Sequence, residues 1–178
     1  FWPPCAGATM LVARHDGHKI TSYVADLVTF ATAACFVPSA LAALCEHVIA
    51  ERSSTVLASC EAPQALTYDK LRVAIACGEA LPASTIELFF RAFHTKTTTP
   101  PMLTNVYGPT EADMTFFELT PAHAKTPPPI GRPMDNVVVY LLGRDGRAVP
   151  PGALGELHFG APHAARGYLG RPDLTEAA

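Results

Sequence analysis

Short apolar runs alternate with stretches of helical periodicity over the first hundred residues of the chain. The apolar runs have the length of buried strands and occupy residues 8–13, 31–37, 71–76 and 102–106. Between them, apolar side chains recur three and four positions apart, which is the spacing of one helix face. Because strands that alternate with helices usually pair in parallel, this pattern predicts a βαβαβαβ sheet with crossover helices.

Three helices are predicted within this alternation. The first carries an apolar face made of Ile20, Tyr23, Val24, Leu27 and Val28. Ser39 can cap the second helix, whose apolar positions run from residue 41 to residue 49. Pro82 suits the first turn of the third helix, and its buried stripe is Ile86, Phe89, Phe90 and Phe93. The polar, irregular stretch between the last two helices, residues 53–69, is expected to be a surface loop.

The pattern changes after the proline run at residues 127–129. Residues 136–142 are apolar, residues 156–160 alternate in polarity, and a Gly-Arg-Asp-Gly-Arg turn lies between them. Strand periods without helices predict an antiparallel hairpin or meander. We therefore expect a parallel α/β portion over residues 1–126 and a β-rich portion over residues 127–178 of the same domain.

Composition restricts the classes of function. The chain has 178 residues, of which 49% are apolar and 16% charged, as in a globular protein with much buried surface. Its net charge of −3 argues against a nucleic-acid partner bound through phosphates. No apolar run reaches the length of a membrane span and the N-terminus lacks a basic leader, so a cytoplasmic location is expected.

The five cysteines are odd in number and show neither CxxC spacing nor a pairing with the seven histidines. A zinc site is therefore not expected. Cys35, Cys45 and Cys77 stand among apolar residues. We interpret them as small, reduced, hydrophobic side chains.

Ligands of parallel sheets bind beyond the carboxyl ends of the strands. That rule selects residues 35–39, 77–80 and 107–111. The last segment lies in NVYGPTEAD, residues 105–113, where a Gly-Pro turn leads into Thr110 and Glu111. A hydroxyl can bond a phosphate oxygen and a carboxylate can hold a divalent cation. The plain alternative is a solvated turn after a strand.

NVYGPTEAD resembles the nucleotide-binding signature of the adenylate-forming enzymes, and in particular of the amino-acid adenylation domains of nonribosomal peptide synthetases. Further blocks resemble that family in the same order: FWPPCAGATMLVA, CFVPSAL, LRVAIACGEALP, PPIGRPMDNVVVYLL and GELHFGAPHAARGYLGRPDLTEAA. The resemblance extends over nearly the whole chain. It implies an incomplete adenylate-forming fold, a piece of the large N-terminal subdomain. The family's phosphate loop, its amine-pairing Asp, its ribose-binding Asp and its catalytic lysine match no residue here.

The resemblance also implies a role for each candidate residue. The catalytic candidates are Thr110, which would bond the α-phosphate, and Glu111, which would ligate Mg²⁺. The nucleotide-binding residues would be Gly78, Glu79, Ala80, Asn105, Tyr107, Gly108 and Thr110. The amino-acid pocket would be lined by Cys35, Ile75, Cys77, Val106, Met114 and Thr115, which are mostly small or apolar and suit an uncharged side chain. The alternatives are a helix-start acid for Glu111, a core aromatic for Tyr107, a plain turn at residues 78–80 and core positions for the pocket residues.

The activity implied by the resemblance is the ATP- and Mg²⁺-dependent formation of an aminoacyl adenylate. The aminoacyl group would then pass to the phosphopantetheine thiol of a peptidyl carrier protein domain. No general base is needed because the attacking carboxylate is already an anion, so catalysis would come from positioning and charge neutralisation. The isolated chain is expected to be inactive without the rest of its own adenylation domain. The alternatives are a fragment of an acyl-CoA or aryl-CoA ligase, or a fragment that only binds a nucleotide or a partner.

Overall fold

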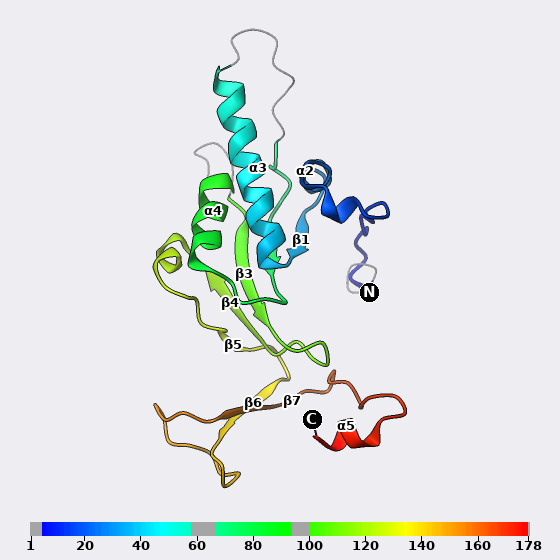
Figure 1. Ribbon diagram of the computed structural model, residues 1–178, viewed down its shortest axis with the longest axis vertical. Helices are drawn as coiled ribbons and strands as arrows, with labels where there is room; N and C mark the ends of the chain where they lie inside the picture. The colour runs from blue at the N-terminus through cyan, green and yellow to red at the C-terminus, as the bar shows by residue number, and fades with distance from the viewer. Residues whose placement is uncertain (1–4, 58–66, 94–99, 178) are drawn as a thin grey trace. The chain divides into compact units, whose positions relative to one another are not determined.

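The alternating segments form a parallel sheet with helical crossovers, as the sequence predicts. The computed structural model describes residues 5–57, 67–93 and 100–177 (Figure 1). β1 pairs with β2 and β2 pairs with β3, both in parallel, with Ala33 opposite Val73 and Val73 opposite Met102. The elements up to this point are η1 (Gly17–Lys19), α2 (Thr21–Val28), β1 (Ala33–Phe36), α3 (Pro38–Leu57), β2 (Val73–Ala76), α4 (Ala83–Phe93) and β3 (Met102–Tyr107).

The remaining strands are antiparallel. β6 and β7 form a two-stranded sheet in which Tyr140 lies opposite His158, and this confirms the predicted hairpin. Within the connection between these two strands, the Gly143 amide donates a hydrogen bond of 2.8 Å to the Arg147 carbonyl. The later elements are β4 (Thr115–Leu119), η2 (Pro121–Lys125), β5 (Arg132–Pro133), β6 (Val138–Leu142), β7 (Glu156–Gly160) and α5 (Pro172–Ala177).

The antiparallel pair of β4 and β5 was not foreseen by the sequence analysis. Thr115 lies opposite Pro133 and Phe116 opposite Arg132, and the strand order of the larger sheet is β1-β2-β3-β4-β5.

The chain divides into two compact units. The first comprises residues 1–105 and 118–128, and the second comprises residues 106–117 and 129–178.

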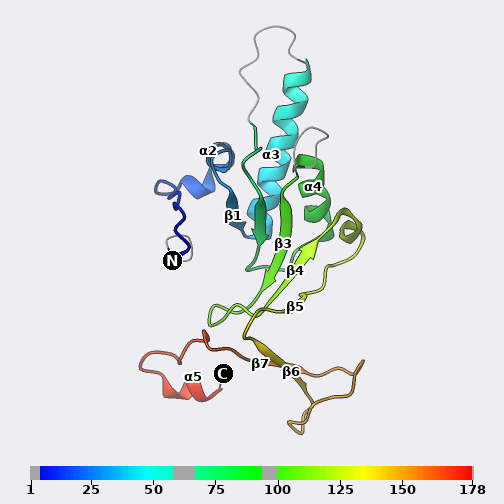
Figure 2. The same cartoon turned by 180° about the vertical axis from the view of Figure 1, so that it is seen from behind.

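The core of the first unit lies between the sheet and two helices. α3 and α4 cover the same face of β1, β2 and β3, which Figures 1 and 2 show from opposite sides. Ala74, Ala76 and Leu103 on that face are completely buried. The helices meet them with a set of side chains that are at most 1% exposed: Leu41, Leu44, Val48, Ile86 and Phe89. The predicted apolar faces of the second and third helices are therefore confirmed, with Phe90 of the third only partly buried.

Two expectations were wrong in this unit. Residues 8–13 are irregular and exposed rather than a strand, because no strand of the described chain offers their backbone a hydrogen-bonding ladder. Residues 53–57 continue α3 instead of beginning a loop. Ser53 and Ser54 donate their hydroxyls to the carbonyls four residues earlier, at 2.9 and 3.0 Å, so both polar side chains are satisfied within the helix. The middle of the expected loop, residues 58–66, lies outside the described residues.

No helix in the described part of the chain is both long enough and apolar enough to cross a lipid bilayer.

Candidate functional site

In the first unit, the ends of β1 and β2 bring four of the predicted residues together. Cys35 on β1 and Cys77 just after β2 have their sulfur atoms 3.3 Å apart. Ile75 is the register partner of Cys35 and therefore shares its face of the sheet. Gly78 then turns the chain with a φ of +85°, a conformation that glycine adopts without strain. The structure thus places these candidate residues together near the carboxyl ends of two neighbouring parallel strands.

The Glu79 side chain ties the loop after β2 to the start of α3. Its two carboxylate oxygens accept hydrogen bonds from the amide and the hydroxyl of Ser39, each at 3.3 Å. A carboxylate at a helix N-terminus satisfies unpaired amides and complements the positive end of the helix dipole. From the family resemblance we expect the backbone of residues 78–80 to run along an adenine ring. The structure adds a capping role for the Glu79 side chain.

Asn105 ends the part of β3 that belongs to the first unit. It lies opposite Ala76 in the parallel ladder and is 7% exposed. The next two residues belong to the second unit. Val106 is partly buried, whereas Tyr107 is 43% exposed and is therefore not the core aromatic that the alternative interpretation required.

The signature turn after β3 is tight and closed by its own backbone. The Met114 amide donates to the Tyr107 carbonyl at 3.0 Å, and the Ala112 amide donates to the Pro109 carbonyl at 3.1 Å. Gly108 leaves no room for a side chain, since a Cβ there would lie 2.3 Å from the Ala112 carbonyl oxygen. This closure exposes Thr110 and leaves Glu111 partly exposed at the head of the turn.

Glu111 has a specific partner within the second unit. The Tyr168 hydroxyl donates a hydrogen bond to its Oε1 atom, and the Ala165 amide donates to its backbone carbonyl at 2.9 Å. The bond from Tyr168 favours the charged carboxylate and lowers the pKa of Glu111, while the same bond raises the pKa of Tyr168. Glu111 is therefore ionised near neutral pH.

Tyr168 is not among the candidate residues that were selected from the sequence. It lies 57 positions after Glu111 in a different block, and no spacing rule connects the two. The only signal was its membership of the resembling stretch GELHFGAPHAARGYLGRPDLTEAA. His163 from the same stretch also contacts the turn, with its Nε2 atom 2.9 Å from the Asp113 carbonyl oxygen.

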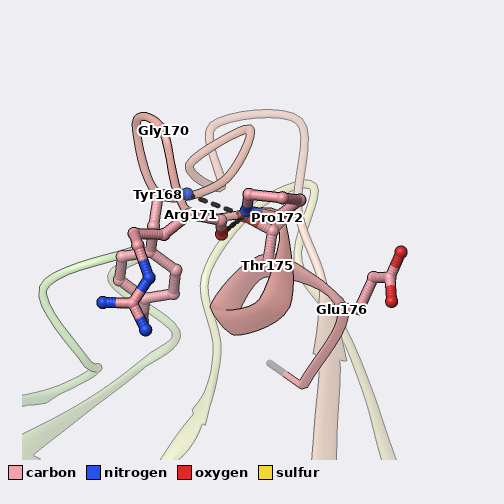
Figure 3. Close-up of a pocket in the computed structure, with 6 residues that line it drawn as sticks. All are labelled: Tyr168, Gly170, Arg171, Pro172, Thr175 and Glu176. Carbon is pink, nitrogen blue, oxygen red and sulfur yellow. Dashed lines mark hydrogen bonds between the residues drawn. The ribbon is translucent and has the colours of Figure 1, made fainter.

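The segment around α5 fixes the backbone of Tyr168. The Tyr168 amide donates to the Thr175 hydroxyl at 3.0 Å, and that hydroxyl donates to the Arg171 carbonyl at 3.0 Å (Figure 3). An open depression lies here, lined by Tyr168, Gly170, Arg171, Pro172, Thr175 and Glu176. None of the candidate residues named from the sequence lines it. We therefore interpret it as a support for Tyr168.

Met114 and Thr115 are buried, at 3% and 2% exposed. The Thr115 hydroxyl donates to the Ile130 carbonyl at 2.6 Å. These two predicted pocket residues therefore hold together the second unit. By contrast, Cys35 is exposed and Cys77 is partly exposed, whereas Cys45 is buried. The reason is that α3 and α4 cover the opposite face of the sheet.

Replacing Tyr168 by Phe is expected to raise the pKa of Glu111 towards its ordinary value, because the donor to Oε1 is lost. A carboxylate whose folded-state pKa is depressed stabilises the fold above its unfolded pKa, and this contribution disappears as the pH falls through the folded pKa. The wild type should therefore exceed the variant in stability near neutral pH but not in strong acid. NMR titration of the Glu111 side chain measures the pKa directly.

The matched control for this variant is Tyr140→Phe, which removes a hydroxyl from an exposed tyrosine on β6. It should leave the titration of Glu111 unchanged. If Tyr168→Phe also leaves that titration unchanged, the hydrogen bond between the two side chains does not exist in solution.

Comparison with known proteins places the chain in a family. A model of the AMP-binding enzyme family matches residues 1–169. Among curated proteins, the chain is 34% identical over 99% of its length to a plipastatin synthase of Bacillus subtilis. It is 38% identical over 98% of its length to phosphinothricin tripeptide synthetase PhsB of Streptomyces viridochromogenes. The chain spans 5% of the first relative and 13% of the second.

Solved structures share the fold at lower identity. The anthranilate CoA ligase AuaEII, solved with anthranoyl-AMP, superimposes with a TM-score of 0.71 at 18% identity, over 97% of this chain and 30% of the ligase. A benzoate CoA ligase from Burkholderia xenovorans LB400 gives a TM-score of 0.70 at 21% identity, over 99% of this chain and 32% of the ligase. At such identities the likeness concerns the fold alone.

Proposed function

The chain belongs to the AMP-binding enzyme family, and from this premise we propose that it forms part of an ATP-dependent domain that activates an amino acid as its adenylate. The activated group then passes to the phosphopantetheine thiol of a peptidyl carrier protein domain. The relatives that match 98–99% of the chain at 34–38% identity include a tripeptide synthetase, which supports an amino acid as the substrate.

The observation that carries the proposal is the state of Glu111 at the signature turn. Its carboxylate stands at the carboxyl end of β3, is partly exposed, and accepts a hydrogen bond from Tyr168 that lowers its pKa. A solvated turn would not need this hydrogen bond from a side chain 57 residues further along the chain. A turn that presents a hydroxyl and an ionised carboxylate side by side is suited to a nucleotide phosphate with its cation.

The residues fit Mg²⁺ in the manner usual for nucleotide enzymes. The described residues contain no group of three or more His, Cys, Asp or Glu side chains that could form a protein cage for a metal ion. Mg²⁺ typically uses one or two carboxylates, with waters and substrate phosphates as its other ligands. Glu111 would be that carboxylate, and the bound ion would offset charge on the phosphates.

The remaining roles concern position and charge. Thr110 is exposed beside Glu111 and would donate its hydroxyl to the α-phosphate. Asn105, Tyr107 and the loop at residues 78–80 would hold the base. The substrate carboxylate attacks phosphorus and pyrophosphate departs, so the protein needs only to align the two anions and reduce their repulsion.

We assign the amino-acid pocket to the six residues selected from the sequence. Cys35, Ile75 and Cys77 share one face at the ends of β1 and β2, and none carries a charge. Val106 continues β3 beyond Asn105, and Met114 with Thr115 follows the signature turn. In each unit these residues are uncharged, and such a composition suits an uncharged side chain.

Amino-acid-dependent exchange of pyrophosphate into ATP tests the proposal on the full-length protein that carries this chain. We expect exchange with one or a few uncharged amino acids and none with the corresponding acids that lack the α-amino group. A protein that exchanges with aryl or fatty acids instead would be an acyl-CoA or aryl-CoA ligase. If the protein melts cooperatively and no acid supports pyrophosphate exchange, the proposed activity is wrong. The remaining interpretation is then a protein that binds a nucleotide without catalysis.

A further inference from the structure

The contact between Cys35 and Cys77 is built into the register of the sheet. β1 and β2 pair in parallel with Cys35 opposite Ile75, and the Cys77 amide extends the ladder by donating to the Phe36 carbonyl at 3.0 Å. Side chains at register partners and at every second residue share a face. Cys35, Ile75 and Cys77 therefore lie on one face, and their backbones hold the two sulfur atoms at 3.3 Å.

This face is the accessible side of the sheet in the first unit. Ala74 and Ala76, which alternate with these residues, are completely buried beneath α3 and α4. The opposite side, towards the viewer in Figure 2, carries Cys35, which is exposed, and Cys77, which is partly exposed. Both thiols can therefore be reached by small reagents.

Cys45 provides an internal contrast. It is completely buried on α3, and burial raises the pKa of its thiol to about 12. The thiolate is the reactive form of cysteine, so Cys45 remains protonated and inert. Among the cysteines of the described residues, only Cys35 and Cys77 combine access to solvent with a second sulfur atom at contact distance.

We propose that Cys35 and Cys77 form a redox-active dithiol that closes to a disulfide when the protein meets a peroxide. One thiolate attacks a peroxide oxygen, the O–O bond breaks, and a sulfenic acid and one water result. The second thiol attacks the sulfenic sulfur, the S–S bond forms, the S–O bond breaks and a second water leaves. Two thiols lose two electrons and hydrogen peroxide is reduced to two waters. A thiol reductant reverses the step.

Closing the bridge requires movement of the strand ends as well as of the side chains. A disulfide has an S–S bond of about 2.05 Å, so sulfur atoms at 3.3 Å must approach by about 1.2 Å. Cys35 is the register partner of Ile75, so Cys77 is its diagonal neighbour. The backbones of diagonal neighbours lie further apart than those of most bridged cysteines, so the disulfide would draw the ends of β1 and β2 together.

The disulfide should also change how the amino acid binds, and this expectation rests on the proposed function. Both cysteines belong to the proposed amino-acid pocket, so bridging them changes the shape of its wall. We expect oxidation to raise the KM for the amino acid by about tenfold, the scale of a one-methylene misfit in an apolar pocket. A thiol reductant should restore the original value.

The test oxidises the full-length protein with hydrogen peroxide, alkylates the remaining thiols and maps the digested peptides by mass spectrometry. The expected product is a cross-linked pair of peptides containing Cys35 and Cys77, lighter by two hydrogen atoms than the sum of the two reduced peptides. Cys35→Ser and Cys77→Ser should each abolish the cross-link. Cys5→Ser, which removes an exposed cysteine on another segment, should preserve it.

Two results would count against the proposal in different ways. If a protein with an unchanged melting temperature yields both cysteines alkylated, or oxidised separately to sulfinic acids, the dithiol is not redox-active. If the cross-link forms in full while the KM for the amino acid stays the same, the dithiol stands and its place in the substrate pocket is wrong. The peptide map does not depend on activity, so it remains informative even if the proposed function fails.

Discussion

Glu111→Gln is expected to slow adenylate formation by about 10²–10³-fold, the usual cost of losing one electrostatic contact to the reacting groups. The amide keeps the shape of the side chain and can still accept the hydrogen bond from Tyr168. It lacks the negative charge that would bind Mg²⁺. Stability should change by no more than about 0.5 kcal/mol, as for most substitutions of exposed polar groups.

Pyrophosphate exchange at several Mg²⁺ concentrations, together with the melting temperature, measures both effects of this variant. Glu87→Gln is the matched control, since it neutralises an exposed carboxylate on α4 and should leave both quantities unchanged. Suppose instead that the Glu111→Gln protein exchanges pyrophosphate at the wild-type rate and has a melting temperature several degrees lower. Glu111 would then be a structural acid of the turn, and the metal assignment would be wrong.

Gly108→Ala is expected to destabilise the protein by about 1–3 kcal/mol, the range found for overpacked sites, and to remove most of the activity with it. The added Cβ would lie 2.3 Å from the Ala112 carbonyl oxygen and 2.7 Å from the Asp113 Cα atom. Both are backbone atoms that cannot rotate aside. The turn that presents Thr110 and Glu111 must therefore open.

Gly160→Ala is the control for this variant. A Cβ at Gly160, the last residue of β7, meets no atom within 4 Å, so the stability should stay within about 0.5 kcal/mol of the wild type. Chemical denaturation compares the three proteins. Wild-type stability and activity in Gly108→Ala would mean that the turn in solution is not closed by the bond between Met114 and Tyr107.

Local periodicity was sufficient to predict the parallel part of the fold. β1, β2 and β3 and the helices between them follow from apolar runs and apolar helix faces, because the period of each element is carried by its own residues. The short strand β5 could not be predicted in this way. It consists of Arg132 and Pro133 alone and exists only because β4 lies beside it. The irregular path of residues 8–13 likewise depends on the absence of a pairing strand in the described chain.

The candidate site could likewise be predicted only where its residues are neighbours in the sequence. Thr110 and Glu111 could be selected because a Gly-Pro turn, a hydroxyl and an acid follow one another in the sequence. The lowered pKa of the carboxylate depends on Tyr168, which is 57 residues away and reaches Glu111 only in the folded chain. The contact between Cys35 and Cys77 depends in turn on the register of two strands, which no pattern within either strand specifies.

Direct detection of an aminoacyl adenylate is the sharpest test of the proposed function. The full-length protein would be incubated with ATP, Mg²⁺ and a mixture of amino acids, and its bound small molecules identified by mass spectrometry. The account predicts an aminoacyl adenylate with an uncharged side chain, formed only with Mg²⁺, and its transfer to the phosphopantetheine thiol of an added carrier protein. A protein that is folded and binds ATP, yet yields no aminoacyl adenylate, or yields only adenylates of acids without an amine, would contradict it.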